Sequence, residues 1–292
     1  MSDSEKIIDL IKQSDSKFSK SQKRISAYIT EHYDRAAFMT ASKLGSVVNV
    51  SESTVVRFAS ELGYDGYPEF QKALQELIKN KLTSVQRMEI ISSKIGDEDV
   101  LKKVINSDIE KLRQTLDTVS GKDFENAVST IVNAGTVYIL GARTCSTIAS
   151  FLGLYLNLLL PDVRIVTANS ASEVFEQMYR ISADDVLVAI SYPRYSLRTF
   201  NGVKFASERN AKVVAITDSI ASPIEKYSSC TLVARCDMGN FVDSLVAPLS
   251  LVNALVVAIV IRNKAQTAQT FESLEDIWKK YHVYRETDDF DK

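Results

Sequence analysis

The sequence predicts an all-α helix-turn-helix domain followed by an α/β domain with a doubly wound, five-stranded parallel sheet. Over the first ~80 residues, apolar side chains recur at helical spacing and no strand-like alternation is present. From residue 136, short β-branched runs alternate with helical segments, which is typical of a parallel sheet covered on both faces. A chain of 292 residues is long enough for two such domains.

The helix-turn-helix is predicted between residues 40 and 63. A short helix over 40–48 contains the small residue Gly45 and is followed by the tight turn 49–51. Ser51 is a candidate N-cap of the next helix, and Gly63 is placed to end it in a left-handed conformation. The apolar residues of this second helix share one face at spacing i, i+3, i+4, i+7; they are Val55, Phe58, Ala59 and Leu62.

The opposite face of the second helix carries small hydroxyl groups and one arginine, where a solvated helix would carry a Lys/Glu mixture. In a helix-turn-helix this helix enters the major groove, and an arginine such as Arg57 reaches the N7/O6 edge of guanine. We therefore predict double-stranded DNA as a partner. The residues predicted to contact DNA are Ser51, Ser53, Thr54, Arg57, Lys43 and Lys23. A three-helix packing module with a solvated outer face is the alternative.

The charge distribution is uneven along the chain. The formal net charge is −2, and the pI is near 5.9, so the whole molecule is not a polybasic nucleic-acid binder. Between residues 17 and 57, however, seven Lys/Arg stand against three Asp/Glu. A local basic patch on a mildly acidic protein favours a binder that finds DNA without adhering everywhere.

Composition also argues against several other classes of protein. The three cysteines, at 145, 230 and 236, show no paired-ligand spacing, so we expect reduced thiols in a cytoplasmic protein and no metal site. The start of the chain has no signal-peptide pattern. The apolar run 245–261 is interrupted by Pro248 and is expected to be a buried helix, with no membrane association.

We divide the chain into four parts: the helix-turn-helix domain (1–83), a helical linker (84–129), the α/β domain (130–265) and a C-terminal helix with its tail (266–292). Breaks in the linker are expected at 96–97 and at Gly121. The predicted strands are 136–142, 163–169, 185–191, 212–218 and 231–236, and the predicted helices that follow are 144–160, 171–181, 196–210, 220–227, 241–263 and 271–284.

The two loops after the first and third strands are the candidate ligand site. In the common strand order 2-1-3-4-5, a crevice lies between these loops, beyond the carboxyl ends of the strands. The loops read GARTCS (141–146) and SYPRYS (191–196). Arg143 and Arg194, with helix N-terminal amides and hydroxyl groups, suit a phosphate or a carboxylate. Alternatively, each arginine pairs with a carboxylate such as Glu173 or Asp218, or faces solvent.

Catalysis has little support in the sequence. The two histidines, His32 and His282, lie in the helical domain and the tail, and neither a nucleophile elbow, a phosphate-binding loop nor a dinucleotide fingerprint is present. We expect no enzymatic activity and no cofactor.

Both halves resemble the RpiR family of bacterial transcriptional regulators. The stretch NVSESTVVRFASELGYDGYPEFQKAL (49–74) resembles the family's helix-turn-helix, and about 130–265 looks like a sugar isomerase (SIS) domain. The resemblance implies a repressor or activator whose SIS domain senses a phosphorylated sugar or related metabolite and also dimerises. It adds Ser191, Ser196 and Thr144 to the effector-binding residues.

The chain departs from the SIS pattern in both loops. Where Gly-x-Gly-x-Ser is common, the sequence has Arg143 in place of a glycine and Cys145 in place of the serine. Where Ser-x-Ser-Gly-Glu-Thr is usual, 191–196 keeps the first serine and a final hydroxyl but loses the glutamate, which argues against isomerase activity.

We therefore expect a ligand-responsive DNA-binding regulator, a homodimer or tetramer, in which the linker transmits the signal of a small anionic metabolite. A phosphosugar isomerase with an accessory helical domain is one alternative. A scaffold whose helical domain binds protein is another.

Overall fold

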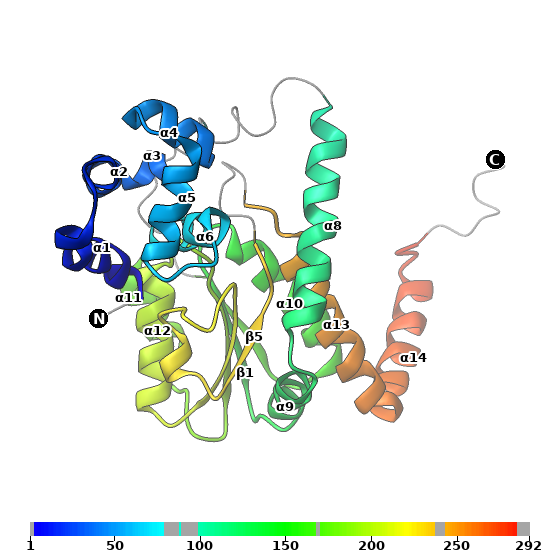
Figure 1. Ribbon diagram of the computed structural model, residues 1–292. Coiled ribbons are helices and arrows are strands. Elements are labelled where there is room, and N and C mark those ends of the chain that lie inside the picture. The colour runs from blue at the N-terminus through cyan, green and yellow to red at the C-terminus, as the bar shows by residue number, and fades with distance from the viewer. Residues whose placement is uncertain (1–2, 79–87, 89–98, 168–169, 237–242, 285–292) are drawn as a thin grey trace. The chain divides into compact units, whose positions relative to one another are not determined.

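The computed structural model describes residues 3–78, 88, 99–167, 170–236 and 243–284. The chain divides into two compact units, residues 1–98 with 238–241 and residues 99–237 with 242–292. The first unit is built from helices and the second from a sheet with helices around it (Figure 1). The predicted break at 96–97 and the end of the tail beyond 284 lie outside the described residues.

The first unit packs its helices around one apolar core. Phe58 is fully buried at its centre, with its ring centroid 4.9 Å from that of Phe18 and 5.9 Å from that of Phe70. The elements are α1 (Asp3–Ser14), η1 (Asp15–Lys17), α2 (Lys20–Glu31), α3 (Tyr33–Ala36), α4 (Ala41–Val48), α5 (Glu52–Glu61) and α6 (Tyr67–Ile78).

Helices α4 and α5 form the predicted helix-turn-helix. Asn49 ends α4 in a left-handed conformation with φ +56°, and the Ser51 hydroxyl caps α5 by accepting a backbone N–H of its first turn. A Cβ on Gly45 would lie 2.8 Å from the carbonyl oxygen of Val50, so only glycine lets the turn fold back this closely on α4. Gly63 has φ +90°, as expected of the residue that follows α5.

The second unit contains the five predicted parallel strands in the predicted order, β2-β1-β3-β4-β5. Neighbouring strands run parallel throughout, so all five carboxyl ends lie on one edge of the sheet. The strands are β1 (Val137–Gly141), β2 (Val163–Val166), β3 (Val186–Ile190), β4 (Lys212–Thr217) and β5 (Cys230–Val233).

Helices cover both faces of the sheet. Alternate residues of the central strands enter one core with α9, α10 and α13, and the intervening residues enter another with α11 and α12. The run predicted to be a buried helix is α13, which packs in the first of these cores. The helices are α8 (Val100–Thr118), α9 (Gly121–Val132), α10 (Cys145–Leu159), α11 (Ala171–Gln177), α12 (Leu197–Glu208), α13 (Val246–Arg262) and α14 (Lys264–Lys280).

Some predicted element boundaries are wrong. The predicted helix 220–227 is only the short 3-10 helix η2 (Glu225–Tyr227), because Pro223 interrupts the segment. The predicted break at Gly121, by contrast, is confirmed: α8 ends at Thr118, and α9 begins at Gly121 with Ser120 as its N-cap. The terminal helix starts at Lys264, and α8 and α9, from the segment predicted as a linker, belong to the second unit.

Over the described residues, no single helix has the length and hydropathy needed to span a membrane. Only α13 and α14 taken together pass that test, and the pair is bent by 98°.

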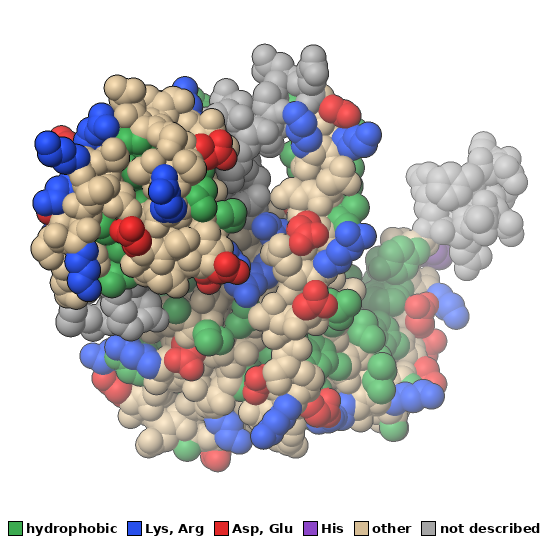
Figure 2. All heavy atoms as spheres, in the orientation of Figure 1, with side chains coloured by type: hydrophobic (Ala, Val, Ile, Leu, Met, Phe, Trp, Pro, Cys, Tyr) green, Lys and Arg blue, Asp and Glu red, His purple; other side chains and the backbone are tan. Residues whose placement is uncertain are grey.

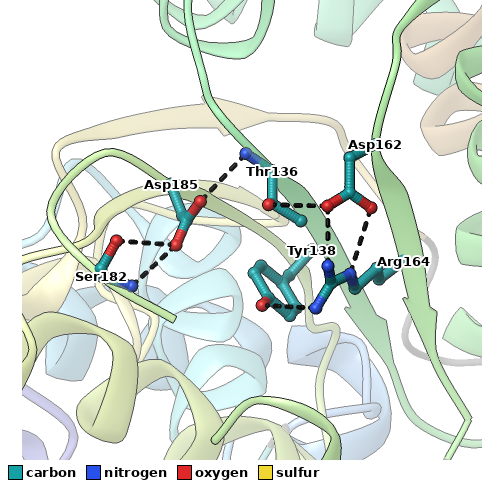
Figure 3. Close-up of polar contacts among 6 residues, drawn as sticks. All are labelled: Thr136, Tyr138, Asp162, Arg164, Ser182 and Asp185. Atoms are coloured by element: carbon teal, nitrogen blue, oxygen red, sulfur yellow. Dashed lines mark hydrogen bonds and ion pairs between the residues drawn. The ribbon is translucent and has the colours of Figure 1, made fainter. Parts of the chain in front are cut away.

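A polar network joins the starts of the central strands (Figure 3). The Asp185 carboxylate accepts the Thr136 backbone N–H at 2.9 Å and the Ser182 backbone N–H at 2.8 Å. Asp185 is buried, so these bonds compensate for its lost hydration and hold the entries of β1 and β3 together.

The second part of this network ties β1 to β2. Asp162 pairs with Arg164 at 2.7 Å and accepts the Thr136 hydroxyl at 2.9 Å, and Arg164 donates to the Tyr138 hydroxyl at 3.2 Å. The hydrogen bond from Arg164 lowers the pKa of the Asp162 carboxyl.

Asp162 should therefore make the α/β unit sensitive to acid. A carboxyl whose folded-state pKa is depressed stabilises the fold above its unfolded-state pKa of about 3.9, and this contribution is lost as the pH falls through the folded-state value. We expect Asp162→Asn to lower the melting temperature at pH 6–7, with the difference from the wild type vanishing towards pH 3. Asp184→Asn, at an exposed aspartate, is the control. A difference that stays constant with pH would contradict this prediction.

Candidate functional site

The predicted DNA contacts of α5 lie on its exposed face. Ser51, Ser53 and Arg57 are exposed and Thr54 is half-buried. The Ser51 hydroxyl lies 2.9 Å from that of Ser53 and 2.8 Å from that of Thr54, and Arg57 Nε donates to the Ser53 carbonyl at 3.3 Å. The start of α5 therefore presents a compact group of hydroxyls beside one guanidinium, with free helical amides below it.

The two lysines of the predicted interface lie on other helices. Lys43 is exposed on α4, and Lys23 is exposed on α2. The Lys23 ammonium lies 3.9 Å from the Asp15 carboxylate, with half of each side chain exposed, so solvent screens this pair strongly. Only four of the six predicted DNA contacts therefore come from a single element.

The two predicted effector loops start from paired residues of neighbouring strands. Gly141, the last residue of β1, pairs with Ile190, the last residue of β3, so the loops that follow leave the sheet side by side. A backbone hydrogen bond of Tyr192 to the Cys145 sulfur also joins them. The structure thus brings the five predicted effector residues to one edge of the sheet.

Both arginines of these loops hold a backbone conformation that normally favours glycine. Arg143 has φ +58° and Arg194 has φ +64°. A left-handed conformation costs an L-residue roughly 1–2 kcal/mol, and such strain is concentrated at functional sites. Both side chains are exposed, and the Arg143 guanidinium has no hydrogen bond or ion pair with the described residues.

The hydroxyl-bearing residues of the site differ in burial. Thr144 is exposed at the start of α10, and Ser196 is half-buried and caps α12 by accepting the Arg198 N–H at 3.2 Å. Ser191 is only 2% exposed, and its hydroxyl has no hydrogen-bond partner in the described part of the chain. A buried hydroxyl without a hydrogen-bond partner costs the fold its lost hydration, so Ser191 calls for an explanation.

Tyr192 is a site residue that sequence reasoning missed. It belongs to the second predicted loop, 191–196, where its side chain is buried and its hydroxyl has no partner among the described groups. Burial, reinforced by the nearby Cys236 thiol and the Asp218 carboxyl, raises its pKa far above the usual tyrosine value. A tyrosine in a loop carries no local sign of burial, so no sequence pattern identified it.

Asp218 connects the second effector loop to the rest of the unit. It is buried at the end of β4, and its carboxylate accepts the Tyr195 hydroxyl at 2.8 Å. Its carbonyl oxygen accepts from Arg235 at 3.4 Å, and the Arg235 backbone N–H donates to the Thr115 hydroxyl of α8 at 2.8 Å. Helix α8 is thereby bonded to residues that contact the loop 191–196.

Other features of the unit are less suited to a ligand. A cavity of about 420 Å³ lies at the opposite edge of the sheet, beside Asp184, Asp185 and Lys212. The Asp185 carboxylate is already used by the strand-joining network. The three cysteines are buried and form no disulfide, and the described residues contain no group of three His, Cys, Asp or Glu side chains arranged for a metal ion.

Backbone strain at Arg143 and Arg194 predicts that replacing either residue with glycine stabilises the α/β unit. Arg143→Gly and Arg194→Gly remove a side chain from a left-handed backbone, so each should raise the free energy of unfolding of the α/β unit by about 0.5–1 kcal/mol. Chemical denaturation measures this directly. Arg198→Gly, inside α12, is the control and should destabilise, because glycine is a poor helix former. Destabilisation by both loop variants would show that the arginines are structural.

Two solved structures share this fold. The sugar isomerase domain of the RpiR transcription factor from Sphaerobacter thermophilus aligns with a TM-score of 0.59 and 26% identity, over 61% of this chain and 99% of that domain. The NanR protein of Vibrio vulnificus, solved in complex with ManNAc-6P, aligns with a TM-score of 0.58 and 22% identity, over 92% of this chain and 97% of NanR.

Sequence relatives agree with this assignment. An uncharacterized HTH-type transcriptional regulator of Haemophilus influenzae is 22% identical over 86% of this chain and 88% of its own length. Another, from Thermotoga maritima, is 26% identical over 78% of this chain and 81% of its own. A family model described as a helix-turn-helix domain of the rpiR family matches residues 5–81, and a SIS domain model matches residues 130–258. The chain belongs to the rpiR family of helix-turn-helix transcriptional regulators.

Proposed function

We propose that the protein binds operator DNA through α5 and releases or tightens that binding when a small anionic metabolite occupies the loops 142–146 and 191–196. The observation that carries the proposal is the pair of left-handed arginines, Arg143 and Arg194, on adjoining loops. The ligand class that fits two guanidiniums, a helix N-cap and a buried hydroxyl is a phosphorylated or carboxylated sugar. The ManNAc-6P bound by NanR belongs to this class.

A regulator is favoured over a phosphosugar isomerase at this site. Tyr195 stands where SIS loops usually carry a glutamate, and its hydroxyl is already bonded to Asp218. The loop therefore offers a fixed hydrogen-bond network in place of a carboxylate that would move a proton.

The signal reaches α8 through bonded groups. Tyr195 of the effector loop contacts Asp218, which is linked through Arg235 to Thr115 of α8. The Ser244 hydroxyl adds a second tie to α8, donating to Asp108 at 2.6 Å. Because α8 starts at the first described residues after the helical unit, a shift in these contacts is passed along the chain towards the DNA-binding helices. Coupling of this kind is typically ~1–3 kcal/mol.

A homodimer fits the apolar surface of the second unit. Figure 2 shows hydrophobic side chains gathered over α13 and α14 on the side that faces α8. Large apolar side chains are exposed on several described helices of this unit, among them Leu101 and Leu116 of α8, Leu154 of α10 and Ile261 of α13. In a homodimer, a second copy of the chain covers this apolar surface. The α5 helix of each copy then contacts one half-site of a near-palindromic operator in the cytoplasm.

The DNA-binding half is tested with Arg57→Ala. If Arg57 contacts a guanine, the variant should bind a selected operator about 5- to 150-fold more weakly, which corresponds to ~1–3 kcal/mol for such a contact. Its melting temperature should stay unchanged, because the side chain is exposed. Lys72→Ala, at an exposed lysine of α6, is the matched control for charge. Unchanged affinity in Arg57→Ala would remove this residue from the interface.

The sensing half is tested with a panel of phosphorylated and carboxylated sugars that includes ManNAc-6P. The active member should raise the melting temperature of the wild type and change its operator affinity by roughly 5- to 150-fold. Arg143→Gly and Arg194→Gly should lose both responses while still binding DNA. A normal response in both variants would place the effector elsewhere, and turnover of an aldose–ketose phosphate pair would support the isomerase alternative.

A further inference from the structure

Two exposed large apolar side chains lie on the helix-turn-helix, within residues 7–75 of the helical unit. Among residues 7–75, whose side chains the structure describes, only Val47 of α4 and Val56 of α5 are exposed, by 44% and 37%. All other large apolar residues in that range are at least partly covered. Within residues 7–75, exposure of large apolar side chains is therefore confined to the two helices of the helix-turn-helix.

Val56 lies in the middle of the face proposed to meet DNA. Ser53 precedes it by one helical turn, Arg57 is adjacent, and Ser60 follows it by one turn, so the four residues share a side of α5. The remaining apolar side chains of α5 are buried. Valine is also a weaker helix former than Ala, Arg or Lys, so neither packing nor helix formation accounts for it here.

The polar neighbours of Val56 are bonded along the helix itself. Arg57 Nε donates to the Ser53 carbonyl, and the Ser60 hydroxyl donates to the Val56 carbonyl, both at 3.3 Å. These bonds keep the two polar side chains close to the helix, on either side of the exposed isopropyl group of Val56. An apolar group in this position is stabilised only by apolar contact with whatever docks on α5.

We propose that Val56 reads a thymine in the major groove by contact with its C5-methyl group. The thymine methyl is the apolar feature of the major-groove edges, and side chains that touch it distinguish T·A from the other base pairs. Arg57, next in sequence, contacts a neighbouring base pair or phosphate. This assignment rests on the proposed binding of DNA through α5 and adds a base to what that helix recognises.

The test uses the full chain and duplex DNA enriched from a random library. Each thymine of the enriched site is replaced in turn by deoxyuridine, which removes only the methyl group, and affinity is measured by fluorescence anisotropy at one salt concentration. For the wild type, one thymine per half-site should be sensitive, with affinity falling about four-fold, the effect of losing one buried methyl-sized contact.

Three variants distinguish recognition of the thymine methyl group by Val56 from a general loss of DNA affinity. Val56→Ala should bind more weakly and become insensitive to uridine at that position, whereas Val56→Ile, which keeps the branched apolar group, should remain sensitive. Val47→Ala makes the same change on α4 and should keep full sensitivity.

Two outcomes would overturn the assignment. If uridine is neutral at every position for the wild type, or if Val56→Ala loses affinity for the uridine sites as the wild type does, Val56 does not read thymine. If no DNA is enriched at all, the proposed function itself fails and the role of Val56 falls with it.

Discussion

The parallel pairing of β1 with β3 is the constraint on which the second unit depends. Because these strands are neighbours and run the same way, the loops that follow them leave the sheet from paired residues, Gly141 and Ile190. Without that pairing, nothing would bring the loops that carry Arg143 and Arg194, which are 51 residues apart in the sequence, to the same end of the sheet. Buried bonds at the opposite edge, from Asp185 to the start of β1, hold the same two strands in register.

Backbone strain is present in both loops of the proposed effector site. Two arginines in left-handed conformation cost the fold free energy that two glycines would not, and both stand at positions where SIS loops usually carry glycine. At both positions this chain therefore combines a left-handed backbone with a positively charged side chain. This combination supports the proposal that the two loops bind an anionic effector.

In the helical unit, the main structural feature is an exposed face of α5 that carries mostly short side chains. Gly45 lets the turn fold back onto α4, and the aromatic core around Phe58 fixes α5 from its inner side. The outer side of α5 is then free to carry short hydroxyls, Arg57 and the exposed Val56. Short side chains suit close approach to a DNA backbone, and long ones would hold the helix away from the groove.

The sequence by itself determined the order and type of most elements and the order of the strands, because hydrophobic periodicity and capping residues act over short stretches of chain. The sequence-based prediction was wrong for the helix 220–227, which Pro223 interrupts, and it placed the start of α14 too late. Only the tertiary structure decided the conformation of Arg143 and Arg194, the burial of Tyr192, and the bonds that join Asp218 to α8. These features depend on contacts between residues far apart in the chain, and no local pattern of side chains records such contacts.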